Sequence, residues 1–178
     1  MPEVPPAPEV VLYRCGCSHC DMAEEELRRQ AARHGAAFEV RRVEKEGVGQ
    51  LAGWATPVVY VNGVEISHYT MSAKAWREAL AATLERKRLR GEVVDLRCYE
   101  DSGARGPEHQ ECAEHCINEI KLPMGLLTAD GDLYQVVAGR GTAGAHEGLK
   151  QLIGRQVEIT GDLFHWKGRS TLIVRDVS

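Results

Sequence analysis

The sequence has few aromatic residues, no surplus of basic residues and no long apolar run. Aromatic residues make up only 6% of the chain, and the formal net charge is −4 at pH 7. Nucleic acids and anionic membrane surfaces are usually bound by basic patches, with aromatic side chains added where bases stack. We therefore expect no nucleic-acid partner. A membrane-spanning helix needs about 20 apolar residues in a row, and no stretch of this sequence approaches that length, so no membrane insertion is expected.

The sequence also lacks a basic segment followed by an apolar one near its start, which is the pattern of a secretory signal. Residues 1–8 are instead rich in proline, and we expect them to form a flexible arm. These features predict a cytoplasmic location. The alternative is a periplasmic or exported protein whose signal has been removed.

Cysteine is the residue type that stands out. The chain has six cysteines, which by number alone would permit three disulfides. They fall into two groups, which are Cys15, Cys17 and Cys20 in the first half and Cys98, Cys112 and Cys116 in the second. Such grouping indicates one reactive centre in each half rather than a framework of disulfide staples.

The first half, residues 9–89, is predicted to be an α/β domain. Its elements are defined by apolar runs, alternation and turn signals. We expect strands over 10–13, 38–43, 58–61 and 64–67, and helices over 21–34 and from Ser72 to about Leu89. The pair Asn62-Gly63 is a strong signal for a two-residue hairpin turn. The basic run 86–90 suits the end of a helix.

The second half, residues 91–178, is predicted to be a small, mainly β domain. We expect strands over 92–98, 125–128, 133–137, 157–164 and 170–177, helices over 111–120 and 145–153, and a polar loop over 101–109. Many short strands with one interposed helix are typical of a small, partly open β-barrel. The last part, in which the stretch 154–161 leads into strands, resembles an OB-type barrel.

The motif Cys17-Ser18-His19-Cys20 lies between the first expected strand and the first expected helix. At a helix N-terminus, free backbone N–H groups and the macrodipole favour a thiolate. The second thiol lies about one turn further along the same face, close enough to form a disulfide. The spacing therefore predicts thiol–disulfide chemistry.

With this motif, the order of elements and the pair Thr56-Pro57 ahead of a strand, the first half resembles the thioredoxin superfamily, and in size its glutaredoxin-like branch. The resemblance implies that the Thr56–Pro57 bond is cis, faces the dithiol, and helps to bind an extended substrate. It also implies that Cys17 attacks a disulfide-containing protein or small-molecule substrate and that Cys20 resolves the mixed disulfide, without a cofactor.

Neighbouring residues bear on this chemistry. His19 is expected to lower the pKa of the attacking thiol and to make the couple more oxidising; the alternative is a solvated residue with little effect. Cys15 has three interpretations, namely a third thiol in the exchange, a ligand in a soft-metal site, or an inert strand-end cysteine. The glutaredoxin-like branch has a glycine pair after the hairpin, where this chain has residues 67–71 without glycine. This departure argues against glutathione use.

The second cluster contains Cys98, His109, Cys112 and Cys116. On a helix, spacings of three and four place the last three on one face, and Cys98 at the end of the preceding strand can complete the set. Three thiolates and one imidazole form a common structural zinc site, so zinc or another soft metal is the first interpretation. The alternatives are a disulfide within the cluster, a second redox centre served by the first domain, and inert thiols.

These observations lead to two hypotheses from different classes. The first is a two-domain thiol–disulfide oxidoreductase that uses the dithiol of Cys17 and Cys20, with a second domain that binds metal or relays electrons. The alternative is a protein that binds or delivers a soft metal such as copper, zinc or mercury through both cysteine clusters.

Overall fold

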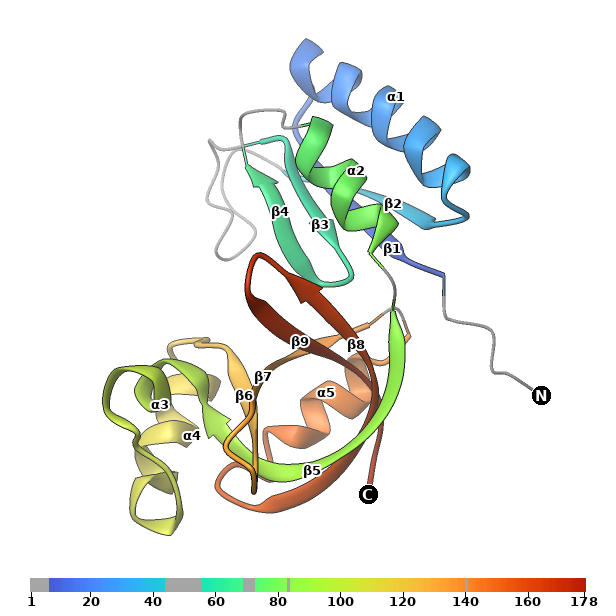
Figure 1. Cartoon of the computed structure of the whole chain (residues 1–178). Coiled ribbons are helices and arrows are strands. Elements are labelled where there is room, and N and C mark those ends of the chain that lie inside the picture. Colours follow the sequence, from blue (N-terminus) through green and yellow to red (C-terminus); the bar gives the residue numbers. More distant parts are fainter. Residues whose placement is uncertain (1–6, 44–55, 69–72, 83, 140) are drawn as a thin grey trace, which may run out of the picture. The chain divides into compact units, whose positions relative to one another are not determined.

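The computed structural model of the chain describes residues 7–43, 56–68, 73–82, 84–139 and 141–178. It divides into two compact units, Met1–Leu84 and Glu85–Ser178, whose elements are labelled in Figure 1. Most of the expected arm over 1–8, the expected helix cap Ser72 and part of the stretch 67–71 lie outside the described residues.

The first unit is built on a four-stranded sheet with the strand order β2-β1-β3-β4. β1 pairs in parallel with β2 and antiparallel with β3, and β3 pairs antiparallel with β4. Helix α1 contacts β1 and β2, while α2 contacts β3 and β4 (Figure 1). The elements of this unit are β1 (Glu9–Arg14), α1 (Ser18–Arg33), β2 (Ala37–Arg42), β3 (Val58–Val61), β4 (Val64–His68) and α2 (Ala73–Ala81).

Local sequence explains where α1 lies and how the hairpin turns. The buried positions of α1 include Cys20, Ala23, Leu27 and Ala31, whose spacings of three and four residues place them on one face. That face packs on β1, in which Val10 and Leu12 are fully buried. The turn between β3 and β4 has positive φ angles at Asn62 (52°) and Gly63 (78°), so the hairpin predicted there is confirmed.

The second unit is a closed five-stranded barrel in which the strands follow the order β5-β6-β7-β9-β8. β7 and β9 run parallel and the other neighbouring pairs run antiparallel. Figure 1 shows α3 and α4 together beside the end of β5. The helices and strands of this unit are β5 (Glu85–Asp95), α3 (Leu96–Ser102), a 3-10 helix (Pro107–His109), α4 (Gln110–Asn118), β6 (Met124–Thr128), β7 (Leu133–Ala138), α5 (Ala143–Leu149), β8 (Gln156–Trp166) and β9 (Arg169–Val177).

The barrel interior is filled by aliphatic side chains from strands and helices. Fully or almost fully buried members include Val93, Ile117, Leu126, Ile159 and Leu172. Helix α4 contributes two buried side chains to this core, those of Ala113 and Ile117, and α5 contributes that of Leu149, so α4 is held at a fixed place on the barrel.

The structure corrects one predicted helix. The helix expected from Ser72 to Leu89 ends at Ala81, and the basic run that follows belongs to β5. The first part of β5 pairs with β8 along eight residues, from Glu85 to Glu92. Here Arg86 binds the fully buried carboxylate of Asp162 at 2.5 Å. Pairing across the barrel thus overrides the helix propensity of arginine, lysine, glutamate and leucine.

The structure also corrects the strand expected over 92–98. It ends at Asp95, and the following residues form α3. The Asp95 side chain caps that helix by accepting hydrogen bonds from the N–H groups of Arg97 and Cys98, at 2.9 and 3.1 Å. Cys98 therefore lies in the first turn of a helix and not at a strand end.

Helices long and apolar enough to cross a membrane are absent from the part of the chain that the structure describes.

Candidate functional site

The end of β1 and the start of α1 bring three cysteines together. Cys15 follows the last residue of β1, Cys17 is the N-cap of α1, and Cys20 lies in its first turn. The Cys17 carbonyl accepts hydrogen bonds from the N–H groups of Cys20 and Asp21, at 3.0 and 3.1 Å. The three sulfur atoms of this N-terminal triad, Cys15, Cys17 and Cys20, all lie within 4.8 Å of one another.

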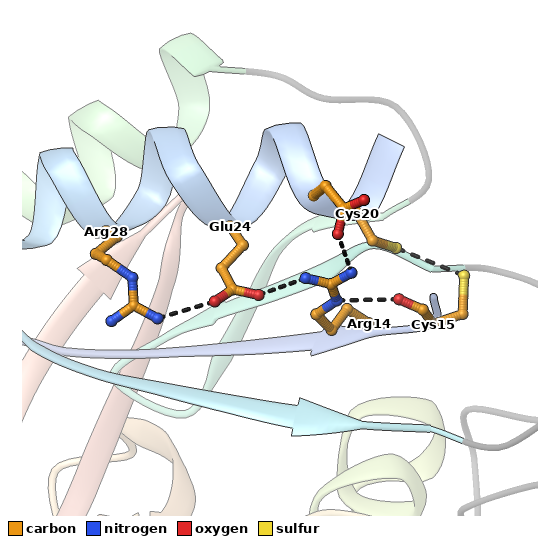
Figure 2. Close-up of polar contacts among 6 residues, drawn as sticks. Arg14, Cys15, Cys20, Glu24 and Arg28 are labelled. Carbon is orange, nitrogen blue, oxygen red and sulfur yellow. Dashed lines mark hydrogen bonds and ion pairs between the residues drawn. The ribbon is translucent and has the colours of Figure 1, made fainter. Parts of the chain in front are cut away.

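Within the N-terminal triad, the Sγ atoms of Cys15 and Cys20 are 3.6 Å apart and face each other in Figure 2. Cys20 is buried, whereas Cys15 and Cys17 are both partly exposed. A partner molecule can therefore reach the sulfur of Cys15 or Cys17 first. Cys20 can react only with one of these two sulfurs, after the partner has bound. The sequence spacing predicted the approach of Cys17 to Cys20 but not the contact between Cys15 and Cys20.

Arg14 fixes the end of β1 against α1. Its Nε donates to the carbonyl of Cys15 at 3.0 Å, and its two terminal nitrogens bind the carboxylates of Asp21 and Glu24. Glu24 also binds Arg28 at 2.9 Å, so it stands between two guanidinium groups (Figure 2). Only 9% of the Arg14 side chain is exposed. This chain of ion pairs holds the backbone of Cys15 in place beside the first turn of α1.

The Thr56–Pro57 peptide bond is cis, as the sequence resemblance implied. Pro57 is buried and Thr56 is partly exposed. Interaction with the Thr56 side chain lowers the pKa of both Cys15 and Cys20. The turn that contains the cis bond therefore lies against the N-terminal triad, where the resemblance expected it.

Hydrogen bonding and burial give two of these thiols opposite acidities. Hydrogen bonds, first from the Thr56 side chain and then from Cys17, lower the pKa of Cys15 from 9.0 to about 7. Burial raises the pKa of Cys20 from 9.0 to about 11. Cys15 is thus ionised to about half at neutral pH, while Cys20 stays protonated. His19, which was expected to tune the thiols, has an exposed side chain.

A second group of three cysteines lies beside the barrel, on the first turn of α3 and along α4. Cys98 is in the first turn of α3, and Cys112 and Cys116 lie one turn apart in α4. Their sulfur atoms are also within 4.8 Å of one another. Cys112 is exposed, Cys98 is partly exposed and Cys116 is buried. We call these three residues the barrel triad.

The Asp95 carboxylate is next to the barrel triad and was missed by the sequence analysis. Asp95 is fully buried. Its Oδ1 caps α3, and its Oδ2 is buried without a hydrogen-bond partner among the described residues. Burial, followed by interaction with this carboxylate, raises the pKa of both Cys98 and Cys116. The signal in the sequence was an aspartate directly before a helix start, which is a common N-cap.

His109 takes a different place from the one expected. Helix α4 begins at Gln110, so His109 lies in the preceding 3-10 helix and not on the face shared by Cys112 and Cys116. The ligand atoms that cluster in the barrel triad are the three sulfurs and do not include the His109 ring. Its Nε2 is buried and has no hydrogen-bond partner among the described residues.

Comparisons with protein-family models, with curated proteins and with solved structures gave no match. The site geometry itself therefore has to define the chemistry. Two cysteine triads are each positioned to hold a metal ion. In the N-terminal triad, a partly exposed thiol of lowered pKa also lies 3.6 Å from a second sulfur.

Proposed function

We propose that the chain is a thiol–disulfide oxidoreductase that works through the N-terminal triad. The observation that carries this proposal is the close approach of sulfur atoms beside a cis proline turn. The sulfurs of Cys15 and Cys20 are 3.6 Å apart and that of Cys17 is within 4.8 Å of both. Interaction with the Thr56 side chain lowers the pKa of two of the three thiols. Disulfide exchange needs a thiolate, an accessible sulfur and a neighbour that can complete the transfer.

Fold features support this proposal. A sheet of order β2-β1-β3-β4 with a parallel β1–β2 pair, and a cis Thr56–Pro57 bond beside a Cys-x-x-Cys helix start, favour a thioredoxin-like domain of glutaredoxin-like size. In the second unit, the closed barrel with a parallel β7–β9 pair favours an OB-like domain. A fold alone does not define an activity, so the proposal depends on the sulfurs.

The proposed exchange proceeds in balanced steps. The Cys17 thiolate attacks one sulfur of a substrate disulfide, forms a mixed disulfide, and releases the other substrate sulfur as a thiolate. Cys20 loses its proton to solvent and attacks the Cys17 sulfur, which releases the second substrate thiolate. The Cys15 thiolate then attacks Cys20, so the disulfide moves to the pair of Cys15 and Cys20 and Cys17 becomes a free thiolate again. Each step is reversible, so the same residues can oxidise or reduce a partner.

Single cysteine variants test these roles. Cys17→Ser should abolish reduction of insulin and of small disulfides, since the attacking sulfur is gone. Cys20→Ser should accumulate a mixed disulfide at Cys17, visible by mass spectrometry of the unreduced protein. Cys15→Ser should keep the first two steps but leave the internal disulfide at Cys17 and Cys20.

Cys112→Ser is the matched control, because Cys112 is an exposed cysteine outside the N-terminal triad. It should leave the rate of exchange unchanged. The activity of Cys17→Ser is measured once with Cys15 free and once with Cys15 alkylated. Full activity in both samples would show that the catalytic assignment is wrong.

Soft-metal binding is the second candidate function, and the observation that favours it is the presence of two triads whose sulfurs converge. Thiolate sulfur is the donor that copper(I), zinc and mercury prefer. Under this hypothesis the chain binds or delivers a metal ion and does not catalyse a reaction. Metal analysis of protein purified without chelator, combined with thiol counting on the same sample, separates the two functions. Metal lost from the N-terminal triad on mutation of Cys15 or Cys17 would favour delivery, while a titratable dithiol without metal favours exchange.

A further inference from the structure

The Asp95 carboxylate and the barrel triad meet at one place on the barrel unit. Two of the three sulfurs, those of Cys98 and Cys116, interact directly with the carboxylate. Asp95 is 0% exposed, and its Oδ2 has no hydrogen-bond partner in the part of the chain that the structure describes. A buried carboxylate oxygen without a partner is costly, and a cation bound at this place would remove that cost.

We propose that Cys98, Cys112, Cys116 and Asp95 form a four-ligand site for a thiophilic divalent cation of the zinc class. The site holds the start of α3 and one face of α4 to the end of β5. The inference rests on the metal-binding capacity of the barrel triad and does not depend on disulfide exchange at the N-terminal triad.

The distances suit such an ion. Zinc binds cysteine sulfur at about 2.3 Å and carboxylate oxygen at about 2.0–2.2 Å in a tetrahedron. Tetrahedral geometry with these bonds separates the sulfurs by about 3.8 Å, and the three sulfurs already lie within 4.8 Å of one another. Binding therefore needs a contraction of about 1 Å at most, which the exposed side chain of Cys112 can supply by a small rotation.

The carboxylate is already oriented for this role. Because Oδ1 accepts hydrogen bonds from two backbone N–H groups of α3, the side chain is fixed and Oδ2 is left available. Fixing a ligand by hydrogen bonds from outside the metal shell is a common feature of metal sites. Neither His109 nor Asp95 lies within 4.8 Å of all three sulfurs. The Asp95 carboxylate does interact with two of them, those of Cys98 and Cys116, so the proposal gives the fourth position to this carboxylate in place of the imidazole expected from the sequence.

The test uses the full chain with Cys15→Ser and Cys17→Ser, which leaves a single sulfur in the N-terminal triad. The apoprotein is titrated with Co²⁺ as a spectroscopic probe and then with Zn²⁺ in competition with a chelating dye. We expect one equivalent of metal, a thiolate-to-cobalt charge-transfer band and the visible bands of a tetrahedral ion. Absence of any stoichiometric metal would overturn the proposal, and the exchange activity of the unmodified chain would be unaffected by that result.

Two further variants identify the fourth ligand. Asp95→Asn keeps an oxygen that can cap α3 but loses the charge. Because loss of a supporting residue outside the metal shell already weakens metal binding by about 10-fold to 100-fold, loss of this direct ligand should weaken zinc binding by at least that much. His109→Ala should bind zinc as tightly as its parent. The reverse pattern, with binding lost in His109→Ala and retained in Asp95→Asn, would overturn the assignment.

X-ray absorption of the zinc-loaded parent identifies the ligands directly. This measurement does not depend on whether an Asp95 variant folds. Three sulfur scatterers and one oxygen, without the outer-shell scattering of an imidazole ring, are expected. An imidazole signature in that spectrum would contradict Asp95 as the fourth ligand.

Discussion

At the scale of single residues, hydrogen bonding decides which thiol of the N-terminal triad is most easily ionised. Thr56 contributes most to the lowered pKa of Cys15, and Cys17 contributes next. Cys20 is shielded from water, and burial raises its pKa. Cys15 is therefore prepared to attack Cys20 in the last step of the exchange or to accept a metal, while Cys20 is kept protonated until the mixed disulfide at Cys17 is presented to it.

The first prediction at this scale concerns the pH dependence of alkylation at Cys15. Its pKa of about 7 lies below the ordinary value of 9.0, and because the thiolate is the reactive form, the rate should rise with pH and level off above about pH 8. At pH 7 about half of Cys15 should be thiolate, against about 1% of an ordinary thiol. Iodoacetamide labelling at a series of pH values, with fragment-ion mapping to separate the three cysteines, measures the midpoint.

Thr56→Val is the matched variant, since valine keeps the shape of threonine but removes the hydroxyl. It should move the alkylation midpoint of Cys15 to higher pH and slow its labelling at pH 7. If the midpoint of the unmodified protein lies near 9, or if Thr56→Val leaves it unchanged, the hydrogen bond does not set the acidity of Cys15.

The residues of the candidate sites were predictable to different degrees. The position of Cys17 at the start of a helix follows from local sequence patterns, and the cis bond before Pro57 was implied by the family resemblance. Both are confirmed. The contact between Cys15 and Cys20 depends on how β1 turns into α1, and Asp95 is brought to the barrel triad by a helix that the sequence analysis did not expect. Such contacts depend on tertiary geometry, which spacing along the chain does not encode.

At the scale of elements, strand β5 organises the barrel unit. It pairs with β8 in its first part and with β6 in its last part, and it ends at Asp95, where α3 begins. Its first residues have high helix propensity, and their strand conformation arises only from pairing with β8 and from the ion pair between Arg86 and Asp162. Local propensity therefore gave the wrong element there, while the strands expected over 157–164 and 170–177 correspond to β8 and β9.

Gly91 tests the role of β5. It pairs with Thr128 on one side and Val157 on the other, and a Cβ atom there would lie 2.4 Å from the carbonyl oxygen of Leu127. The backbone must shift to admit alanine, so Gly91→Ala should lower the free energy of unfolding of the barrel unit by about 1–3 kcal/mol or more. Urea denaturation followed by circular dichroism measures the change.

Gly148→Ala in α5 is the control for this substitution. A Cβ at Gly148 would contact nothing within 4 Å, and alanine has the higher helix propensity, so the same assay should show about 0.5–1 kcal/mol of stabilisation. If Gly91→Ala and Gly148→Ala change the free energy of unfolding by the same amount, the close approach of neighbouring strands does not constrain β5.

At the scale of the whole molecule, each of the two units contains its own sheet, its own core and its own cysteine triad. The barrel core is formed entirely by residues of the second unit. A closed barrel also leaves no strand edge that needs a partner. The two chemistries proposed for the chain are therefore expected to be separable.

Fragments cut between Leu84 and Glu85 test this independence. The fragment Glu85–Ser178 should fold alone, because it is longer than the smallest domains that do so, and it should retain the metal affinity of the full chain. The fragment Met1–Leu84 should retain disulfide exchange. Thermal unfolding without a cooperative transition in the barrel fragment, or loss of exchange in the N-terminal fragment, would contradict the prediction.

The short distance along the chain between Cys15 and Cys20 has a consequence for how redox state affects the fold. A covalent link between them would enclose only the turn from Gly16 to His19. Because the stabilisation from a crosslink grows with the length of the enclosed loop, so small a ring would add about 2 kcal/mol at most to global stability. Arg14 already anchors both ends of this turn. Oxidation should then raise the melting temperature of the first unit by about 8–16 °C at most while the pattern of amide exchange in the sheet stays the same, so a client would sense the state of the sulfurs and not a rearranged surface.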